Sequence, residues 1–166
     1  MAVSMASKPL AVGQKAPDFS LQTTGGTTIT LSQFRGQPVV LYFYPKDDTP
    51  GCTKEACGFR DAQAPLRRMG AVVLGVSGDS VASHGRFSDK YHLTFPLLSD
   101  PEKTAAKAYG VFKQKLLYGR SYLGIERTTF LIDGAGRLAA IFPKVRVDGH
   151  IEEVLEALRQ LGPTST

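Results

Sequence analysis

The chain has 166 residues, of which 42% are hydrophobic and 21% are charged, which is typical of one globular domain and excludes a disordered or fibrous protein. Lysine and arginine total 20 against 15 for aspartate and glutamate, for a formal net charge of +5. This excess is spread along the chain, and only Arg67 and Arg68 are adjacent. We therefore expect a solvated basic surface and no nucleic-acid partner.

The sequence contains no membrane span, because no run approaches the ~18 apolar residues that one needs. The N-terminus also lacks the charged start and apolar core of a secretory signal. We therefore expect a cytoplasmic protein with no membrane partner, with a flexible arm over residues 1–11, a single domain over 12–162 and a tail over 163–166. Its two cysteines are too few for a disulfide scaffold and are more often catalytic or redox-sensing in such a chain.

The first elements in chain order are a hairpin and a buried strand. Residues 16–24 alternate apolar and polar, and Gly25-Gly26 turns the chain into residues 27–31, which predicts a β-hairpin at the edge of the fold. One helical turn is expected over 31–34. The run 39–44 is apolar on both faces, as in a central strand covered on both sides, and Pro45 ends it.

A helix is predicted to begin near Gly51 or Cys52 and to run to Met69, with Pro65 kinking or restarting it. Residues 71–77 form the second buried strand, and Ser80 caps a further helix. A short strand over 95–98 precedes Asp100 and Pro101, which we expect to act as N-cap and first residue of a helix that ends at Gly110.

The C-terminal part contains an irregular or weakly extended segment over 118–125, an antiparallel hairpin formed by 128–133 and 138–142, and a final helix with an apolar face. Strands that alternate with helices indicate a parallel core, to which the late hairpin adds antiparallel strands. The predicted fold class is α/β, with a thioredoxin-like fold: a central mixed β-sheet flanked by helices, with an N-terminal β-hairpin.

Residues 45–60 contain both cysteines, Cys52 and Cys57. A thiol reacts as its thiolate, which is favoured at a helix start by unpaired backbone N–H groups and the helix dipole. Thr49 can present a hydroxyl near the Cys52 sulfur, and a guanidinium from another strand would complete a polar cage, for which Arg127 is the candidate. None of the three histidines (His84, His92 and His150) is near Cys52 in sequence, so a Cys-His dyad would require a tertiary contact.

The sequence resembles the peroxiredoxins at four separated motifs. Pro45-x-x-x-Thr49-x-x-Cys52 matches the family signature, and Glu126-Arg-Thr-Thr-Phe-Leu-Ile-Asp133 contains the family's distant arginine. Gly-Gln-Lys-Ala-Pro-Asp-Phe near the start and Leu-Leu-Ser-Asp-Pro-Glu in the middle also match, so that the similarity covers about residues 12–161. Cys57, five residues after Cys52, is similar to the resolving cysteine of the Q-type or bacterioferritin-comigratory-protein branch.

The resemblance implies a thiol peroxidase with no metal or prosthetic group, a thioredoxin-like reductant and a monomeric state. Cys52 would be the peroxidatic nucleophile and Cys57 the resolving cysteine. Thr49 and Arg127 would bind the peroxide oxygens, and Pro45 would wall the pocket. Glu55 is a candidate for holding the Arg127 guanidinium in place. Phe43, Tyr44, Phe59 and Leu123 are candidates for an apolar pocket suited to organic hydroperoxides.

The spacing of the two cysteines has a geometric consequence. Five residues apart on an ideal helix, with ~1.5 Å rise per residue, two Cα atoms lie about 8–9 Å apart, whereas a disulfide tolerates no more than about 7 Å. If both cysteines are helical when reduced, the first turns of the helix must unwind before the disulfide forms.

Three other functions could use the same two cysteines. Thiol-disulfide oxidoreductases of the same fold prefer Cys-x-x-Cys, whereas four residues separate Cys52 from Cys57. Two cysteines without a histidine at ligand spacing are too few for zinc, so we expect no metal. A peroxide sensor or relay would use the same Cys52 and stays open.

Overall fold

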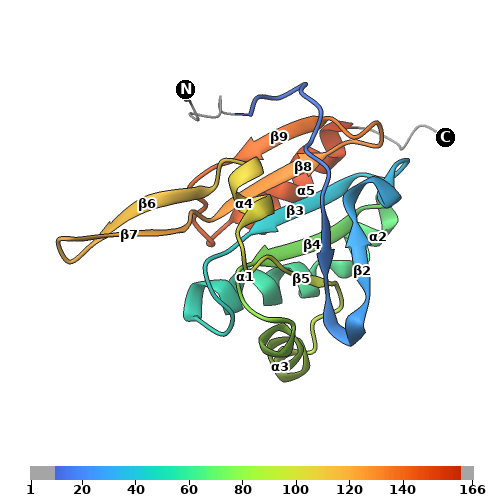
Figure 1. Ribbon diagram of the computed structural model, residues 1–166. Coiled ribbons are helices and arrows are strands. Elements are labelled where there is room, and N and C mark those ends of the chain that lie inside the picture. The colour runs from blue at the N-terminus through green and yellow to red at the C-terminus, as the bar shows by residue number, and fades with distance from the viewer. Residues whose placement is uncertain (1–9, 162–166) are drawn as a thin grey trace.

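The computed structural model describes residues 10–161, which form a seven-stranded mixed sheet with helices on both faces (Figure 1). The strand order is β2-β1-β5-β4-β3-β8-β9, and a separate two-stranded ribbon, β6-β7, projects from one side. Most of the predicted arm and tail lies outside the described residues. Leu10, at the end of the predicted arm, packs against the core. No helix in the described part is long and apolar enough to cross a membrane.

Strands alternate with helices through the central part of the chain. The strands are β1 (Ser20–Gln22), β2 (Thr28–Thr30), β3 (Val39–Phe43), β4 (Val72–Ser77), β5 (Leu97–Ser99), β6 (Phe112–Leu117), β7 (Arg120–Ile125), β8 (Thr128–Ile132) and β9 (Leu138–Phe142). The helices are η1 (Thr24–Gly26), η2 (Leu31–Phe34), α1 (Pro50–Asp61), α2 (Gln63–Arg68), α3 (Val81–Tyr91), α4 (Thr104–Ala108) and α5 (His150–Leu161).

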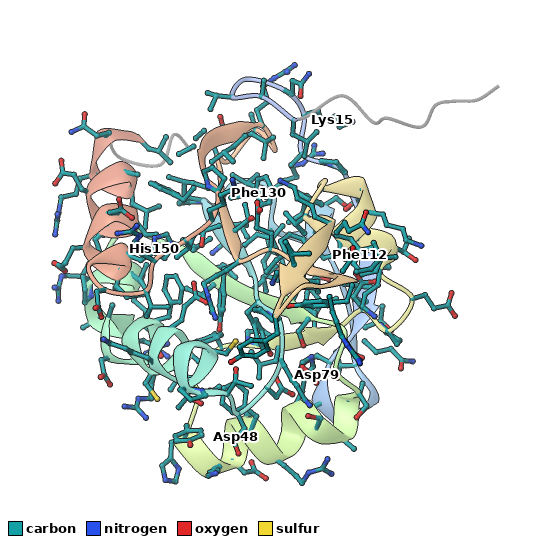
Figure 2. All side chains as sticks on the ribbon, turned by 90° about the vertical axis from the view of Figure 1, so that its left-hand side faces the viewer. Lys15, Asp48, Asp79, Phe112, Phe130 and His150 are labelled. Atoms are coloured by element: carbon teal, nitrogen blue, oxygen red, sulfur yellow. The ribbon has the colours of Figure 1, made fainter. Side chains whose placement is uncertain are left out.

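The centre of the sheet is β3, which pairs in parallel with β4 and antiparallel with β8. All five of its residues are buried, and alternate side chains enter two hydrophobic clusters on opposite faces of the sheet. Leu41 and Phe43 pack on the α4 side, and Val40 and Tyr42 pack on the side of α1 and α5. In Figure 2, Phe130 of β8 lies between His150 of α5 and Phe112 at the start of β6. The predicted α/β, thioredoxin-like class with its N-terminal β-hairpin is confirmed.

The long helix expected before the second strand is divided in two. It begins at Pro50, one or two residues earlier than predicted, because proline fits the first helical position, where no backbone N–H is needed. It breaks at Ala62 (φ −90°, ψ 12°) and restarts as α2. Pro65 causes this break because it lacks an N–H and its ring excludes the carbonyl four residues earlier.

The predicted start of the next helix at Asp100 and Pro101 is wrong. Residues 100–103 form a turn, in which the Lys103 N–H donates to the Asp100 carbonyl at 3.0 Å, and α4 begins only at Thr104. The Asp100 carboxylate nevertheless caps this helix from outside it. It accepts hydrogen bonds from the N–H groups of Ala105 (3.3 Å) and Ala106 (2.9 Å).

The segment over 118–125, predicted as irregular or weakly extended, is one strand of a regular hairpin. β6 and β7 pair antiparallel over six residues each, and a two-residue turn at Tyr118 (φ 53°) and Gly119 (φ 76°) joins them. Turns with two left-handed residues match the twist of a hairpin but usually contain Asn-Gly or Gly-Gly. Tyrosine at such a position is uncommon, so the sequence gives little indication of this turn.

Removing the Asp100 carboxylate should destabilise the fold, because two buried N–H groups at the start of α4 would lose their acceptor. We expect Asp100→Ala to lower the free energy of unfolding by about 1–2 kcal/mol, measured by urea denaturation. Asp100→Asn keeps one acceptor oxygen and should lose less. Glu102→Ala, at an exposed position in the same turn, is the matched control. Equal stability of Asp100→Ala and this control would contradict the capping role.

Candidate active site

Cys52 lies in the first turn of α1, whose N-cap is Thr49. Its side chain belongs to the hydrophobic cluster beneath α1 and is 1% exposed. The first N–H groups of a helix have no acceptor within it, and the helix dipole places positive potential there. A thiolate at this position is therefore stabilised by the backbone, while apolar neighbours keep most water away.

Arg127 links the Cys52 sulfur to a buried carboxylate. It stands between β7 and β8, and its Nη2 donates to Cys52 Sγ at 3.3 Å while its Nη1 donates to Glu55 Oε1 at 2.7 Å. Gly51 permits this approach, because a Cβ at that position would lie 3.1 Å from Nη2. Burial works against the charge on Arg127, but Glu55 and Cys52 outweigh it and raise the pKa of the guanidinium. A fixed positive charge therefore faces the sulfur.

Glu55 is completely buried. Its Oε1 pairs with Arg127, but its Oε2 has no hydrogen-bond partner among the described residues. Burial raises the pKa of Glu55 from an ordinary value of 4.5 to about 7, against the opposing attraction of Arg127. The nearby Tyr42 hydroxyl is also buried without a partner in the described part, and burial, reinforced by Glu55 and Cys52, raises the pKa of Tyr42 well above its ordinary value. Tyr42 is therefore a neutral phenol.

The other predicted site residues lie around this centre with fewer direct contacts. The Thr49 hydroxyl donates to the Lys46 carbonyl at 2.9 Å rather than to Cys52, which leaves its oxygen lone pairs available as acceptors. Pro45 is exposed, and Cys57 is a half-buried free thiol further along α1. The structure thus brings Cys52, Glu55 and Arg127 into direct contact.

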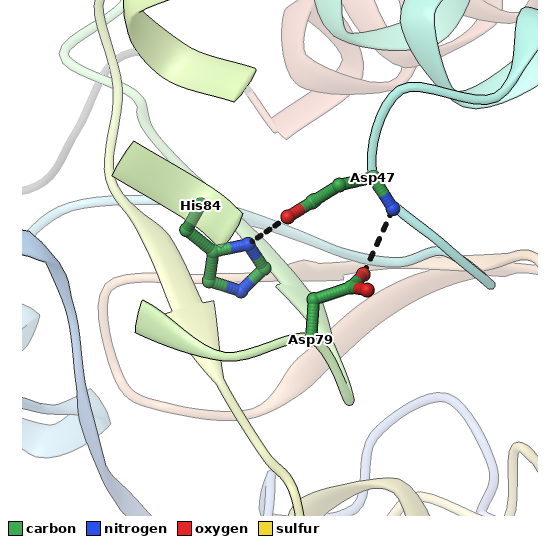
Figure 3. A group of neighbouring side chains, drawn as sticks. All are labelled: Asp47, Asp79 and His84. Atoms are coloured by element: carbon green, nitrogen blue, oxygen red, sulfur yellow. Dashed lines mark hydrogen bonds and ion pairs between the residues drawn. The ribbon is translucent and has the colours of Figure 1, made fainter. Parts of the chain in front are cut away.

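The loop between β3 and α1 is anchored by Asp47, which the sequence analysis did not single out. The Asp47 carboxylate accepts hydrogen bonds from the hydroxyls of Tyr44 (2.6 Å) and Ser83 (2.8 Å) and lies 2.7 Å from His84 Nδ1 (Figure 3). Burial pushes the pKa of Asp47 upward, but these hydrogen bonds outweigh it and hold the pKa below its usual value. The other ring nitrogen of His84 faces the Leu98 carbonyl at 2.9 Å. Both ring nitrogens therefore face protein oxygens, which fixes the orientation of the ring.

Asp79 binds the backbone of the same loop through its side chain. Its carboxylate accepts a hydrogen bond from the Asp47 N–H at 2.8 Å (Figure 3). It also accepts one from the Ser77 hydroxyl at 2.6 Å. Asp47, Asp79 and His84 place their ligand atoms within 4.8 Å of one another, as a metal site would. However, both ring nitrogens of His84 are already engaged by the Asp47 carboxylate and the Leu98 carbonyl. Asp47 and Asp79 follow adjacent parallel strands, a sequence pattern from which their proximity could have been predicted.

The remaining predictions about this region concern the histidines and an apolar pocket. Cys52 accepts no hydrogen bond from a histidine in the described part of the chain. His150 is completely buried against Thr129, and burial lowers its pKa. The proposed pocket of Phe43, Tyr44, Phe59 and Leu123 is wrong: the first three are core residues with at most 1% exposure, and Leu123 stands exposed on β7. Their apolar character is explained by the core.

Comparison with known proteins identifies the family. Residues 12–141 match the AhpC/TSA family. The chain is 56% identical over 149 residues to a putative peroxiredoxin Bcp of Coxiella burnetii, covering 90% of this chain and 99% of the relative. It is 49% identical over 152 residues to peroxiredoxin Bcp of Bacillus subtilis, covering 92% and 97%. This chain is a peroxiredoxin of the AhpC/TSA family.

Solved structures place this peroxiredoxin in the predicted Bcp or Q-type branch. It resembles a Xanthomonas campestris bacterioferritin comigratory protein studied for its alkyl peroxide reduction activity, with a TM-score of 0.85, 42% identity and coverage of 91% of this chain and 99% of that one. It also resembles a mutant of Xylella fastidiosa PrxQ, with a TM-score of 0.88, 40% identity and coverage of 93% and 99%. The peroxiredoxin is a peroxidase and therefore an oxidoreductase.

The raised pKa of Glu55 predicts a pH-dependent stability. The folded state binds the Glu55 proton more tightly than the unfolded state does, so the bound proton stabilises the fold. This stabilisation is fully present below pH 4.5 and is lost as the pH rises through about 7. Relative to Glu55→Gln, wild type should lose up to about 3 kcal/mol of unfolding free energy between these values, from ~1.4 kcal/mol per pKa unit. Urea denaturation from pH 4.5 to 8 measures this. Glu152→Gln, at an exposed position on α5, is the control, and a constant difference between wild type and Glu55→Gln would contradict the assignment.

Proposed function

We propose that this peroxiredoxin reduces hydrogen peroxide and organic hydroperoxides at Cys52, that Cys57 resolves the oxidised cysteine, and that thioredoxin or a similar dithiol reductant completes the cycle. The observation that carries the proposal is the 3.3 Å contact from the Arg127 guanidinium to the Cys52 sulfur at a helix start. The alkyl peroxide reduction described for the Xanthomonas campestris relative supports organic hydroperoxides as substrates.

In the first step, the Cys52 thiolate attacks the terminal oxygen of the hydroperoxide. The sulfur–oxygen bond forms as the oxygen–oxygen bond breaks, and Cys52 becomes a sulfenic acid. The electron pair of the broken bond leaves with the other oxygen, which takes up a proton to give water or an alcohol. Arg127 and the free lone pairs of Thr49 bind the peroxide and stabilise the developing negative charge, and Pro45 limits water at the sulfur.

In the second step, the Cys57 thiol attacks the sulfenic sulfur, which releases water and forms a disulfide. A dithiol reductant then returns both cysteines to thiols by exchange. Both cysteines are free and lie within the continuous helix α1, where the ideal separation of about 8–9 Å exceeds disulfide reach. The first turns of α1 must therefore unwind in each cycle, and an oxidised structure with an unchanged α1 would contradict this.

The contacts at the two ends of this segment support an opening limited to the residues between them. Upstream, Asp47 is tied to His84 and Asp79. Downstream, α1 packs closely on α5 at Gly58, where a Cβ would lie 2.7 Å from Ile151 Cγ1. The segment between these anchors, over residues 49–57, includes both cysteines. Opening confined to it withdraws Cys52 and Ala56 from the core cluster but leaves Phe59 and Leu66 packed there.

The cellular setting is part of the same proposal. Two free cysteines fit a reducing compartment, so we place the enzyme in the cytoplasm, where thioredoxin-type reductants act. The chemistry at Cys52 and Cys57 balances with a peroxide and a dithiol alone and requires no metal or prosthetic group. We assign a monomeric state, since both cysteines of the cycle belong to the same helix.

The two cysteines should separate the steps of the cycle. Cys52→Ser should abolish peroxide consumption in a coupled assay with thioredoxin and its reductase, because no thiolate remains at the helix start. Cys57→Ser should consume roughly one equivalent of peroxide, by forming the sulfenic acid, and then stop. Wild type is the control for sustained turnover. Undiminished turnover by Cys52→Ser would overturn the assignment.

Arg127 should act on the peroxide step and not on reduction of the disulfide. We expect Arg127→Ala to slow the reaction of reduced enzyme with peroxide by about 10²–10³-fold, the range for loss of one donor at a developing oxyanion, measured by stopped flow. The rate at which thioredoxin reduces the preformed disulfide should change little. Arg159→Ala, on the exposed face of α5, should match wild type, and an equally slow reaction in this control would remove the specific role of Arg127.

A further inference from the structure

The exposed apolar surface of the described chain is concentrated on the β6–β7 hairpin. Among the side chains that the structure describes, six large hydrophobic ones are exposed, and four of them stand on this hairpin: Leu116 (75%), Tyr118 (95%), Tyr122 (44%) and Leu123 (64%). Exposed apolar groups gathered in one patch usually mark a site of interaction. The hairpin projects away from the body of the protein (Figure 1), so its tip is accessible from several directions.

The strand register divides the hairpin into two different faces. Leu116 pairs with Ser121 and Leu123 pairs with Gln114, and since paired residues share a face, both leucines stand on a face without a charged residue. The Gln114 side chain also donates to Ser121 across this face. Lys113 and Lys115 alternate onto the opposite face with Tyr122.

The charge of the hairpin has one sign. Residues 112–125 contain Lys113, Lys115 and Arg120 and no acidic residue. Only Lys113 is neutralised, by Glu126 at 3.0 Å. At the base of the hairpin, the ammonium groups of Lys103 and Lys107 lie 5.7 and 5.8 Å from the centre of the Phe112 ring. Positive charge therefore lies on the face opposite the leucines and at the base of the hairpin.

We propose that the β6–β7 hairpin docks this protein on the surface of an anionic lipid bilayer. Tyr118 and the two leucines enter the boundary between headgroups and acyl chains, where tyrosine and leucine are favoured. Arg120, next to the turn, contacts the lipid phosphates, and Lys115, whose ammonium group donates to the Ile125 carbonyl at 2.9 Å, adds its charge to the attraction. This revises the expectation of no membrane partner, which rested only on the lack of a spanning segment.

Two features favour a bilayer over a protein partner. A second copy would bring two hairpins of the same charge together, which opposes association. The tip of the hairpin is convex, so a protein partner would need a preformed pocket to receive it. A fluid lipid interface closes around an inserted tip without such a pocket.

Docking would also bring the active site near the bilayer, because β7 ends at Ile125 and Arg127 follows two residues later. The hairpin would hold the Cys52 site close to the membrane surface.

Binding to vesicles tests the proposal. Wild type should sediment with vesicles of phosphatidylcholine and phosphatidylglycerol and not with phosphatidylcholine alone, and binding should weaken as salt is added. Leu116→Ser with Leu123→Ser, and separately Lys115→Glu with Arg120→Glu, should each weaken binding at least 10-fold. The control pair Val12→Ser with Leu161→Ser changes the two exposed apolar residues outside the hairpin and should bind as wild type does. Consumption of hydrogen peroxide, which does not require a membrane, should be unchanged in every variant.

A reporter variant gives a second measurement that does not depend on loss of binding. The chain has no tryptophan, so Tyr118→Trp places a single fluorophore at the tip, and its emission should shift to the blue with anionic vesicles. An unshifted emission, or equal binding by the hairpin variants and the control pair, would overturn the proposal. So would light scattering that shows a wild-type dimer and monomeric hairpin variants, because a second copy would then cover this face.

Discussion

The two hydrogen bonds of Arg127 join the parts of the molecule that together make the site. The register of β3 against β8 places Phe43 beside Thr128, so the strand that leads to α1 ends next to the residue that follows Arg127. One arm of the guanidinium then reaches Cys52 and the other reaches Glu55. Residues 75 positions apart in the chain thus meet because two buried central strands pair in one register. A slip of that register by one residue would turn the buried side chains of β8 to the opposite face and separate the two halves of the site.

Two buried pairs flank the reactive segment, the ion pair of Arg127 with Glu55 and the hydrogen-bonded pair of His84 and Asp47. Buried pairs add little net stability, because desolvation offsets their attraction, but they hold directions firmly in a low-dielectric interior. The first pair aims a positive charge at the sulfur, and the second fixes the loop from which α1 begins. Glu55 has one buried oxygen without a partner in the described part and a pKa of about 7. Burying this carboxylate costs stability, and its function in the site is to position the guanidinium.

The sequence was most informative where a physical requirement is local. Residues 39–44 are apolar on both faces because β3 is covered on both sides, and Pro65 breaks a helix wherever it stands inside one. Arg127 was proposed as the partner of Cys52 from the needs of a thiolate and from its place at the entrance to a core strand, and family resemblance supported the choice, since nothing local links residues so far apart. The hairpin turn at Tyr118 was missed because its left-handed backbone is held by strand pairing rather than by its own preference. The cap from Asp100 was misplaced because it acts across a turn, and the link between Asp47 and His84 depends on how α3 packs.

The break at Ala62 has a consequence for how far the opening of α1 can spread. Helix formation is cooperative because each residue is held by hydrogen bonds shared with its neighbours along the helix. Pro65 interrupts that ladder, so α1 and α2 are separate cooperative units, and α2 has its own anchor in the core cluster, Leu66. In the proposed cycle, the free energy of each opening is therefore that of a few turns rather than of the whole segment from Pro50 to Arg68. The enzyme can expose Cys57 and Cys52 to each other repeatedly without approaching the threshold of global unfolding.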